Sequence, residues 1–275
     1  MSRPRSAPPH RRSARRAAAG TTATLPAAAL LALTLAGCAT SSDTPATATA
    51  GPADRTLTVL AAASLRDVFT ELGDEFEDTH PGVTVRLSFA GSNDLADQVL
   101  AGAPADVLAT ADEATMARVV DAGDAEQPTL FASNALVVVV PPDNPAGITG
   151  WTDLADPDAK VVICAVAVPC GTATAQVEAS AGEVHAVSEE ASVTDVLAKV
   201  TSGEADAGVV YGTDAALAGD DVRVVPTPET ADVVNRYPIA LLPTADDAAL
   251  AGEFVALVTG TVGREALAAD GFGAP

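Results

Sequence analysis

Two serines stand where a predicted strand gives way to a predicted helix, a position that suits the binding of a small anion. Ser64 follows the apolar segment 57–63, and Ser92 follows the alternating segment 83–89. Serine often opens a helix, because its side chain accepts a hydrogen bond from a free amide of the first turn. The other amides of that turn point outward and attract anions. From these turns alone, an interpretation in which each serine only caps its helix is equally acceptable.

The rest of the chain alternates between strand and helix patterns, which predicts an α/β fold with mainly parallel sheets. The predicted strands cover 57–63, 83–89, 106–112, 134–140, 160–165, 184–188, 205–211, 221–226 and 236–243. Helical spacing of apolar residues predicts helices at 65–79, 92–100, 113–122, 171–182, 192–200, 248–257 and 263–269, with a short helix at 151–154. Because ligands of open α/β sheets bind at the carboxyl ends of the strands, we expect both serines at one binding edge.

Two proline-limited strands indicate that the chain passes twice between two lobes. The valine-rich run after Ala132 ends at a pair of prolines, and the run that begins at Arg236 is bounded by prolines as well. We therefore expect residues 57–131 and 236–275 to form lobe 1 and residues 132–235 to form lobe 2.

The amino-terminal segment has the pattern of an export signal. Six arginines precede an apolar run at 25–36 that is too short to span a membrane, and the run is followed directly by Gly37 and Cys38. Leu-Ala-Gly-Cys resembles the lipobox of bacterial lipoproteins, which implies cleavage after residue 37, a lipid on Cys38 and an extracytoplasmic protein held on the cell membrane. An ordinary signal peptide with an incidental cysteine is the alternative. The small residues of 38–56 are typical of a flexible tether.

Charge and cysteine content limit the classes of function. Loss of six arginines with the signal would change the formal net charge from −22 to −28, so phosphate repulsion argues against nucleic acid as a partner. Outside the cytoplasm, Cys164 and Cys170 are expected to form a disulfide. A metal site is not expected, because the sequence has no Cys-x-x-Cys pair and His80 and His185 stand alone.

Four segments resemble the substrate-binding lipoproteins of bacterial molybdate ABC transporters. They are AAASL at 61–65, FAGSNDLADQVLAGAPADVLATAD at 89–112, VPCGTA at 168–173 and GEADAGVVYGTDA at 203–215. The resemblance runs from about residue 57 to residue 272 and implies the type II periplasmic binding protein fold, with two Rossmann-like lobes joined by two hinge crossings.

The resemblance also implies a set of ligand-binding residues. In such proteins two serines of one lobe hold the oxyanion together with two backbone amides and a tyrosine hydroxyl of the other. By motif these are Ser64, Ser92, the amides of Cys170 and Val193, and the hydroxyl of Tyr211. Molybdate is a fully deprotonated dianion and only accepts hydrogen bonds, so neutral donors suit it. Molybdenum would enter only as the oxyanion, without a direct protein ligand and without any cofactor.

The implied function is extracytoplasmic binding of molybdate, and also of tungstate, by a monomer that delivers it to an ABC transporter permease. The protein would not be an enzyme. Another tetrahedral oxyanion such as sulfate is the first alternative, whereas a phosphate receptor would need an acceptor, for which Asp94 is the nearby carboxylate. A secreted cysteine hydrolase that uses Cys170 with His185 is the alternative from another class, although the partner Cys164 argues against it.

Overall fold

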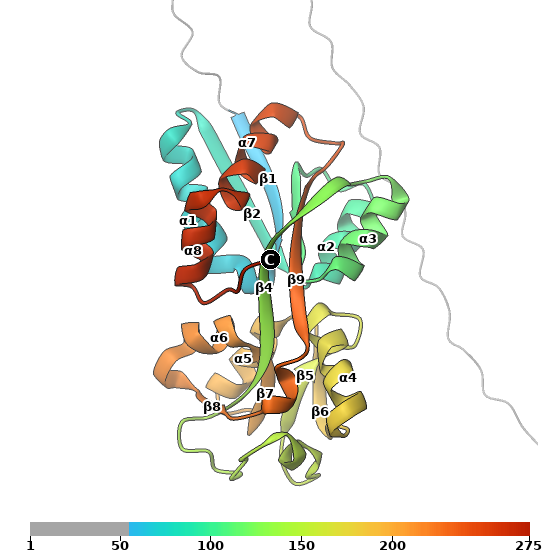
Figure 1. The fold of residues 1–275 in the computed structure, drawn as a ribbon, viewed down its shortest axis with the longest axis vertical. Helices are drawn as coiled ribbons and strands as arrows, with labels where there is room; N and C mark the ends of the chain where they lie inside the picture. Colours follow the sequence, from blue (N-terminus) through green and yellow to red (C-terminus); the bar gives the residue numbers. More distant parts are fainter. Residues whose placement is uncertain (1–54) are drawn as a thin grey trace, which may run out of the picture. The chain divides into compact units, whose positions relative to one another are not determined.

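The computed structural model describes residues 55–275, which form a mixed sheet with helices on both faces (Figure 1). The predicted signal peptide, the Cys38 lipidation site and the predicted tether up to residue 54 lie outside the described residues. Arg55 and Thr56, which the sequence assigns to the tether, already belong to the first strand. In the part of the chain that the structure describes, no helix has the length and hydrophobicity needed to cross a bilayer.

The strands follow the predicted order. They are β1 (Arg55–Ala62), β2 (Val83–Ala90), β3 (Val107–Ala109), β4 (Glu126–Val140), β5 (Val161–Cys164), β6 (Ala186–Glu190), β7 (Ala207–Tyr211), β8 (Arg223–Val225) and β9 (Val234–Leu241). The helices are η1 (Ala63–Leu65), α1 (Arg66–Thr79), α2 (Ser92–Leu100), α3 (Glu113–Ala122), η2 (Trp151–Ala155), α4 (Pro169–Ala181), α5 (Val193–Thr201), α6 (Gly212–Ala218), η3 (Gly219–Asp221), η4 (Pro228–Thr230), α7 (Ala248–Thr259) and α8 (Thr261–Ala269).

Several boundaries differ from the prediction, and two of them lie near the residues of interest. β4 begins at Glu126 instead of residue 134, because its polar first residues pair with β9 at the exposed end of the sheet. α4 begins at Pro169, since proline fits the first turn of a helix, where its missing N–H is not needed. The short helix α6, directly after Tyr211, was not predicted from the sequence.

The sheet consists of two halves that share the long strand β4. The strand order is β2-β1-β3-β9-β4-β7-β5-β6, with β8 also paired to β4. β1 pairs in parallel with β2 and β3, and β5 pairs in parallel with β6 and β7, whereas β4 and β9 run antiparallel to their neighbours. β4 pairs with β9 up to Ala135 and with β7 from Leu136, so one strand links the halves.

The two chain crossings expected from the sequence lie side by side in the sheet. Ala132 of β4 is paired with Tyr237 of β9, and Ser133 is paired with Arg236. Figure 1 shows β4 and β9 passing together from one half of the sheet to the other. The residues predicted as crossing points therefore lie on neighbouring strands.

Helices cover both faces of each half of the sheet. In the first half, α1, α7 and α8 pack together on one face, and α2 and α3 lie on the other (Figure 1). β1 is buried by both layers: Leu57 and Val59 belong to the main core, and Leu60 belongs to the smaller core beneath α2 and α3. In the second half, α5 packs on β5 and β7, while α4 lies on the opposite face with its own contacts to the same strands.

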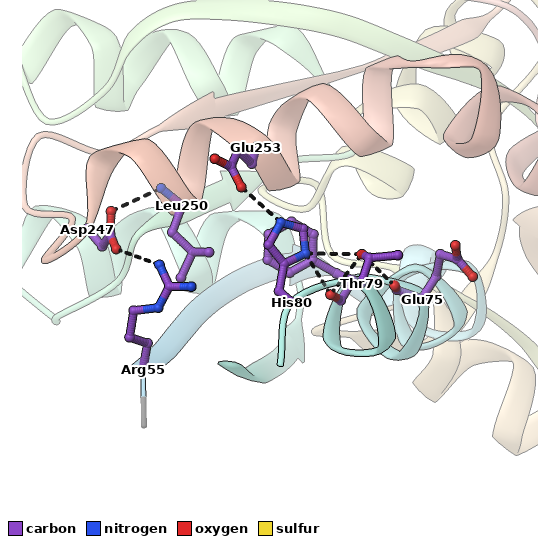
Figure 2. A network of polar contacts seen from close by, with 8 residues as sticks. Arg55, Glu75, Thr79, His80, Asp247, Leu250 and Glu253 are labelled. Atoms are coloured by element: carbon purple, nitrogen blue, oxygen red, sulfur yellow. Dashed lines mark hydrogen bonds and ion pairs between the residues drawn. The ribbon is translucent and has the colours of Figure 1, made fainter. Parts of the chain in front are cut away.

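Polar contacts join helix α7, the last helix but one, to β1 and to the end of α1 (Figure 2). Arg55 of β1 forms an ion pair of 3.3 Å with Asp247, which caps α7 by accepting from the amide of Leu250. His80 stacks on Phe76 at 3.9 Å, and its Nε2 lies 2.9 Å from Glu253. The last segment of the chain thereby returns to the sheet half in which the described chain begins.

Candidate functional site

A small cavity lies where five helical segments begin. Its empty space is about 210 Å³, part of it open to solvent. The cavity is lined by Ala62, Ala63, Ser64, Ala90, Gly91, Ser92, Ala111, Val168, Pro169, Cys170, Ser192, Val193 and Tyr211. Except for Ala111, which lies between β3 and α3, these residues come from the starts of η1, α2, α4 and α5 and from the end of β7, directly before α6. The structure therefore brings all five residues expected to hold an oxyanion to one cavity.

Ser92 lines the cavity, but it is not the helix cap that the sequence predicts. The residue that caps α2 is Gly91, and Ser92 is the first residue of the helix. The Ser92 hydroxyl is buried and accepts a hydrogen bond of 2.9 Å from the amide of Ala111, two residues after β3. Since this bond uses the oxygen as an acceptor, the hydroxyl proton is available to a ligand.

Ser64 is not a helix cap either. It lies inside the single turn of η1, and α1 begins only after Leu65, with no side-chain hydrogen bond at its cap. Both departures have one cause, which is that the helical segment begins before the expected residue. The cap of α2 is Gly91, one residue before Ser92, and the cap of η1 is Ala62, two residues before Ser64. Each serine therefore lies within the first turn and not at the cap position. The Ser64 Oγ instead lies 3.0 Å from the hydroxyl of Tyr237 in β9.

Tyr211 supplies a buried hydroxyl that no other described residue engages. Its side chain is 1% exposed, and its hydroxyl has no hydrogen-bond partner among the residues that the structure describes. Burial raises the pKa of Tyr211 well above its ordinary value, with further contributions from Tyr237 and Asp214, so the hydroxyl stays protonated. An unpaired buried hydroxyl costs free energy, which a ligand oxygen in the cavity would recover.

Cys170 and Val193 contribute backbone amides. Cys170 is the second residue of α4, and Val193 is the first residue of α5, so neither amide has an acceptor within its own helix. Ser192 caps α5 by accepting from the amide of Asp195, as the sequence predicts. The structure has Cys170 bonded to Cys164 as a disulfide, which ties the start of α4 to the end of β5.

The cavity attracts anions through dipoles and not through formal charges. None of the described residues that line it carries a formal charge. The helix starts present partial positive charge to the cavity, which favours an anion.

Asp94 is exposed, accepts a 3.0 Å hydrogen bond from Asn93 and is not among the lining residues, so it does not offer an acceptor there. Within residues 55–275, no group of three or more His, Cys, Asp or Glu side chains is suited to holding a metal ion.

Sequence reasoning missed three residues that complete the site. Tyr237 contacts Ser64, the amide of Ala111 holds Ser92, and Asn235 of β9 donates to the carbonyl oxygens of Ala111 at 2.9 Å and Pro169 at 3.5 Å. Each contact joins segments far apart in the chain, and the local pattern of β9 indicated only a strand. Its alternation gave one weak signal, since it separates exposed Arg236 from buried Tyr237.

Comparison with known proteins assigns the family. A family model described as "Bacterial extracellular solute-binding protein" matches residues 57–273. The chain belongs to this family. The molybdate-binding protein ModA of Mycobacterium tuberculosis is 48% identical over 238 residues, which cover 85% of this chain and 91% of the relative. ModA of Escherichia coli is 35% identical over 68% of this chain and 77% of its own length. This solute-binding protein is thus extracytoplasmic and a relative of the ModA proteins.

Solved structures agree with the fold. The periplasmic molybdate-binding protein of Azotobacter vinelandii matches with a TM-score of 0.67 and 21% identity, over 80% of this chain and 99% of that chain. The sulfate-binding protein SubI of Mycobacterium tuberculosis matches with a TM-score of 0.72 and 20% identity, over 79% and 86%. The predicted type II periplasmic binding protein fold is confirmed, and the family is one of binding proteins, not enzymes. The hydrolase alternative also loses its nucleophile, because the sulfur of Cys170 is bonded to Cys164.

Proposed function

We propose that this solute-binding protein captures molybdate, and also tungstate, in the cavity between the starts of its helices and delivers it to an ABC transporter permease. The observation that carries the proposal is the convergence of Ser64, Ser92, Tyr211 and the amides of Cys170 and Val193 on one uncharged cavity. A fully deprotonated tetrahedral dianion accepts hydrogen bonds only, and these groups donate them. The 48% identity to the molybdate-binding protein of Mycobacterium tuberculosis supports the choice of ion.

The strength of binding would come from several preorganised donors. A hydrogen bond to a charged group contributes about 1.5 to 3 kcal/mol. Hydrogen bonds from the hydroxyls and amides that line the cavity would therefore outweigh the repulsion from the acidic surface. Dissolved salt screens that repulsion beyond a Debye length of about 8 Å.

Release and delivery would follow from movement of two lobes. Residues 57–131 and 236–275 would form one lobe and residues 132–235 the other, with the paired crossings near Ala132 and Arg236 as the hinge. Ser64 and Ser92 lie on the first segment, whereas Cys170, Val193 and Tyr211 lie on the second. Closing around the ion would join both sets of donors, and the closed protein would be the form that the permease recognises. A lipid on Cys38 would hold this monomer at the cell membrane.

Ion binding can be tested by thermal unfolding and titration calorimetry of the purified protein with molybdate, tungstate, sulfate and phosphate. At a ligand concentration about 1,000 times Kd, the free energy of unfolding should rise by about 4 kcal/mol. Molybdate and tungstate should raise the unfolding midpoint strongly, and sulfate and phosphate should raise it little at the same concentration. A protein stabilised by sulfate but not by molybdate would be a sulfate receptor, and the proposal would be wrong.

A further inference from the structure

Tyr237 contacts Ser64 and is not among the residues that line the cavity that the proposed ligand would occupy. Its side chain is fully buried, and its hydroxyl lies 3.0 Å from the Ser64 Oγ, although 173 residues separate the two in the chain. Its ring makes edge-on contacts with Tyr211 at 6.1 Å and Phe272 at 5.5 Å. Because packing fixes the ring, the hydroxyl has a defined position relative to Ser64.

The ligand chemistry decides which hydroxyl donates in this pair. Ser64 has one proton, and a dianion that only accepts hydrogen bonds requires that proton. The Ser64 oxygen then accepts from Tyr237, which keeps its own proton because burial raises the pKa of Tyr237 above its ordinary value. Asn134 and Tyr211 also lie close enough to the Tyr237 hydroxyl to affect its pKa, and Asn134 in addition donates to Thr213 and accepts from the amide of Ala135.

Ser92 shows the same arrangement with a different donor. The amide of Ala111 donates to the Ser92 oxygen at 2.9 Å, and an amide has no choice of direction. Each serine therefore lines the cavity and has a second group that can donate to its oxygen, the Tyr237 hydroxyl for Ser64 and the Ala111 amide for Ser92. When the oxygen of a serine hydroxyl already accepts a hydrogen bond, its proton remains available for a ligand oxygen in the cavity.

We propose that Tyr237 is a positioning residue that determines specificity: by donating to Ser64, it turns the Ser64 proton toward the oxyanion and keeps the serine lone pairs away from it. The inference rests on the proposed function and extends it to the selection between oxyanions. A protonated oxyanion such as hydrogen phosphate needs an acceptor for its own proton, and a Ser64 hydroxyl fixed as a donor does not offer one. Tyr237 thus selects for fully deprotonated oxyanions.

The test compares Tyr237→Phe, Ser64→Ala and the double variant by titration calorimetry with molybdate and with inorganic phosphate at pH 7.5. Phe keeps the ring and removes the hydroxyl, so the apo variant should unfold close to the wild-type temperature. We expect Tyr237→Phe to weaken molybdate binding by about tenfold, the factor that corresponds to 1.4 kcal/mol. The ratio of phosphate affinity to molybdate affinity should rise, because the freed Ser64 hydroxyl can turn and accept.

The double variant separates positioning from packing. If Tyr237 acts through Ser64, Tyr237→Phe should cause no further loss of molybdate affinity in the Ser64→Ala background. Phe272→Leu, which disturbs the other face of the Tyr237 ring, serves as the packing control and should leave the phosphate-to-molybdate ratio unchanged. Equal losses from Tyr237→Phe in both backgrounds, or an unchanged ratio, would overturn the inference.

A second measurement needs no substitution. Proton NMR of the wild-type protein with molybdate should detect a slowly exchanging Tyr237 hydroxyl proton with a close contact to the Ser64 side chain. Failure to find such a proton, while the amide proton of Ala111 is detected, would also overturn the inference. A wild-type protein that does not bind molybdate would refute the proposed function itself, and this outcome is distinct from a molybdate-binding protein that is indifferent to Tyr237→Phe.

Discussion

Burial sets the protonation state of the ionisable side chains around the cavity. It keeps Tyr211 and Tyr237 protonated, and it raises the pKa of Asp214 in α6 to about 7, mainly by desolvation and against the effect of hydrogen bonds from backbone amides. Asp214 is 4% exposed and accepts a 3.2 Å hydrogen bond from the amide of Tyr211. A carboxyl directly behind a cavity residue thus changes charge near neutral pH.

Asp214→Asn should change how stability depends on pH. In the unfolded chain this carboxyl loses its proton near pH 3.8, and in the folded protein it does so near pH 7. Between these values the folded state holds a proton that the unfolded state has lost, so the free energy of unfolding falls as pH rises from about 4 to about 7. The fall attributable to Asp214 is about 4 kcal/mol.

Asparagine keeps an acceptor for Tyr211 and does not ionise, so Asp214→Asn should gain stability relative to the wild type by about that amount between pH 4 and pH 8. Urea unfolding at several pH values measures the difference. Asp94→Asn, at an exposed site, is the control for the loss of one carboxylate. Parallel pH curves for Asp214→Asn and the wild type would contradict the prediction.

Single hydroxyl deletions test the two cavity donors that the structure buries most fully. Tyr211→Phe should weaken molybdate binding by about 1.5 to 3 kcal/mol, equivalent to roughly 10- to 150-fold, and should not lower apo stability, because the hydroxyl has no partner among the described residues.

Ser92→Ala should weaken binding similarly but also lower apo stability by about 1 kcal/mol, because the amide of Ala111 loses its acceptor. Calorimetry and urea unfolding measure both, and unchanged affinity in both variants would remove these residues from the site.

Sequence reasoning at the residue scale succeeded where the information is local. A strand end followed by a helix placed Ser64 and Ser92 at one edge, but the prediction that they cap helices was wrong, because a cap depends on where the helix begins to within one residue. Tyr237 could not be found in this way. Its contact with Ser64 depends on the pairing of β9 with β3 and β4, which no local pattern encodes.

At the scale of elements, the backbone at the start of α2 lies in close contact with the backbone of the segment before α5. A Cβ atom added to Gly91 would lie 2.2 Å from the carbonyl oxygen of Ala191, far inside a normal contact. The backbone of Gly91 is ordinary, with φ −57°. Glycine is therefore required here by the approach of two segments and not by the conformation of its own chain.

Gly91→Ala should weaken molybdate binding by tenfold or more while leaving the separate sheet halves folded, because the added methyl keeps the start of α2 away from Ala191. A loss of this size corresponds to about 1.4 kcal/mol. Calorimetry measures the affinity, and circular dichroism reports the fold. Gly252→Ala is the matched control, since a Cβ atom at that helical position meets nothing within 4 Å. Wild-type affinity in Gly91→Ala would show that this contact is not needed for binding.

The disulfide provides the second prediction at this scale. Cys164 and Cys170 are six residues apart, and the turn between them is so tight that a Cβ atom on Gly171 would lie 2.0 Å from the carbonyl oxygen of Ala165. Replacing both cysteines by alanine should lower the free energy of unfolding by about 2 kcal/mol, because the disulfide no longer restricts the unfolded chain to a short closed loop. It should also weaken molybdate binding, because the amide of Cys170 is no longer held. Urea unfolding and calorimetry measure the two effects, and stability loss with unchanged affinity would limit the disulfide to a structural role.

At the scale of the whole described chain, β4 and β9 are the strands that would carry the proposed movement. Asn235 lies in this region and donates to the carbonyl oxygen of Ala111 in one segment and to that of Pro169 in the other. The side chain is 7% exposed. Proline-bounded strands in the sequence indicated the two crossings. The sequence could not indicate that Asn235 contacts both Ala111 and Pro169, because these partners are 124 and 66 residues away.

Small-angle X-ray scattering tests the proposed movement. Molybdate should decrease the radius of gyration of the wild-type protein, because the two lobes close around it. Asn235→Ala removes a contact between the lobes, so the variant should need more molybdate to reach the same compact state, and its affinity should fall by several-fold. Ser133→Ala, on the neighbouring strand but hydrogen-bonded to Ala274, is the control. A radius that does not change with molybdate would argue against hinge closure.

The position of β9 also bears on when the protein can fold during its export. β9 lies between β3 and β4 in the sheet, yet it comes from residues 234–241, near the end of the chain. Until these residues have been synthesised, β3 lacks one of its two neighbours and Ser64 lacks Tyr237. The nascent chain therefore cannot complete its first sheet half until β9 has been synthesised.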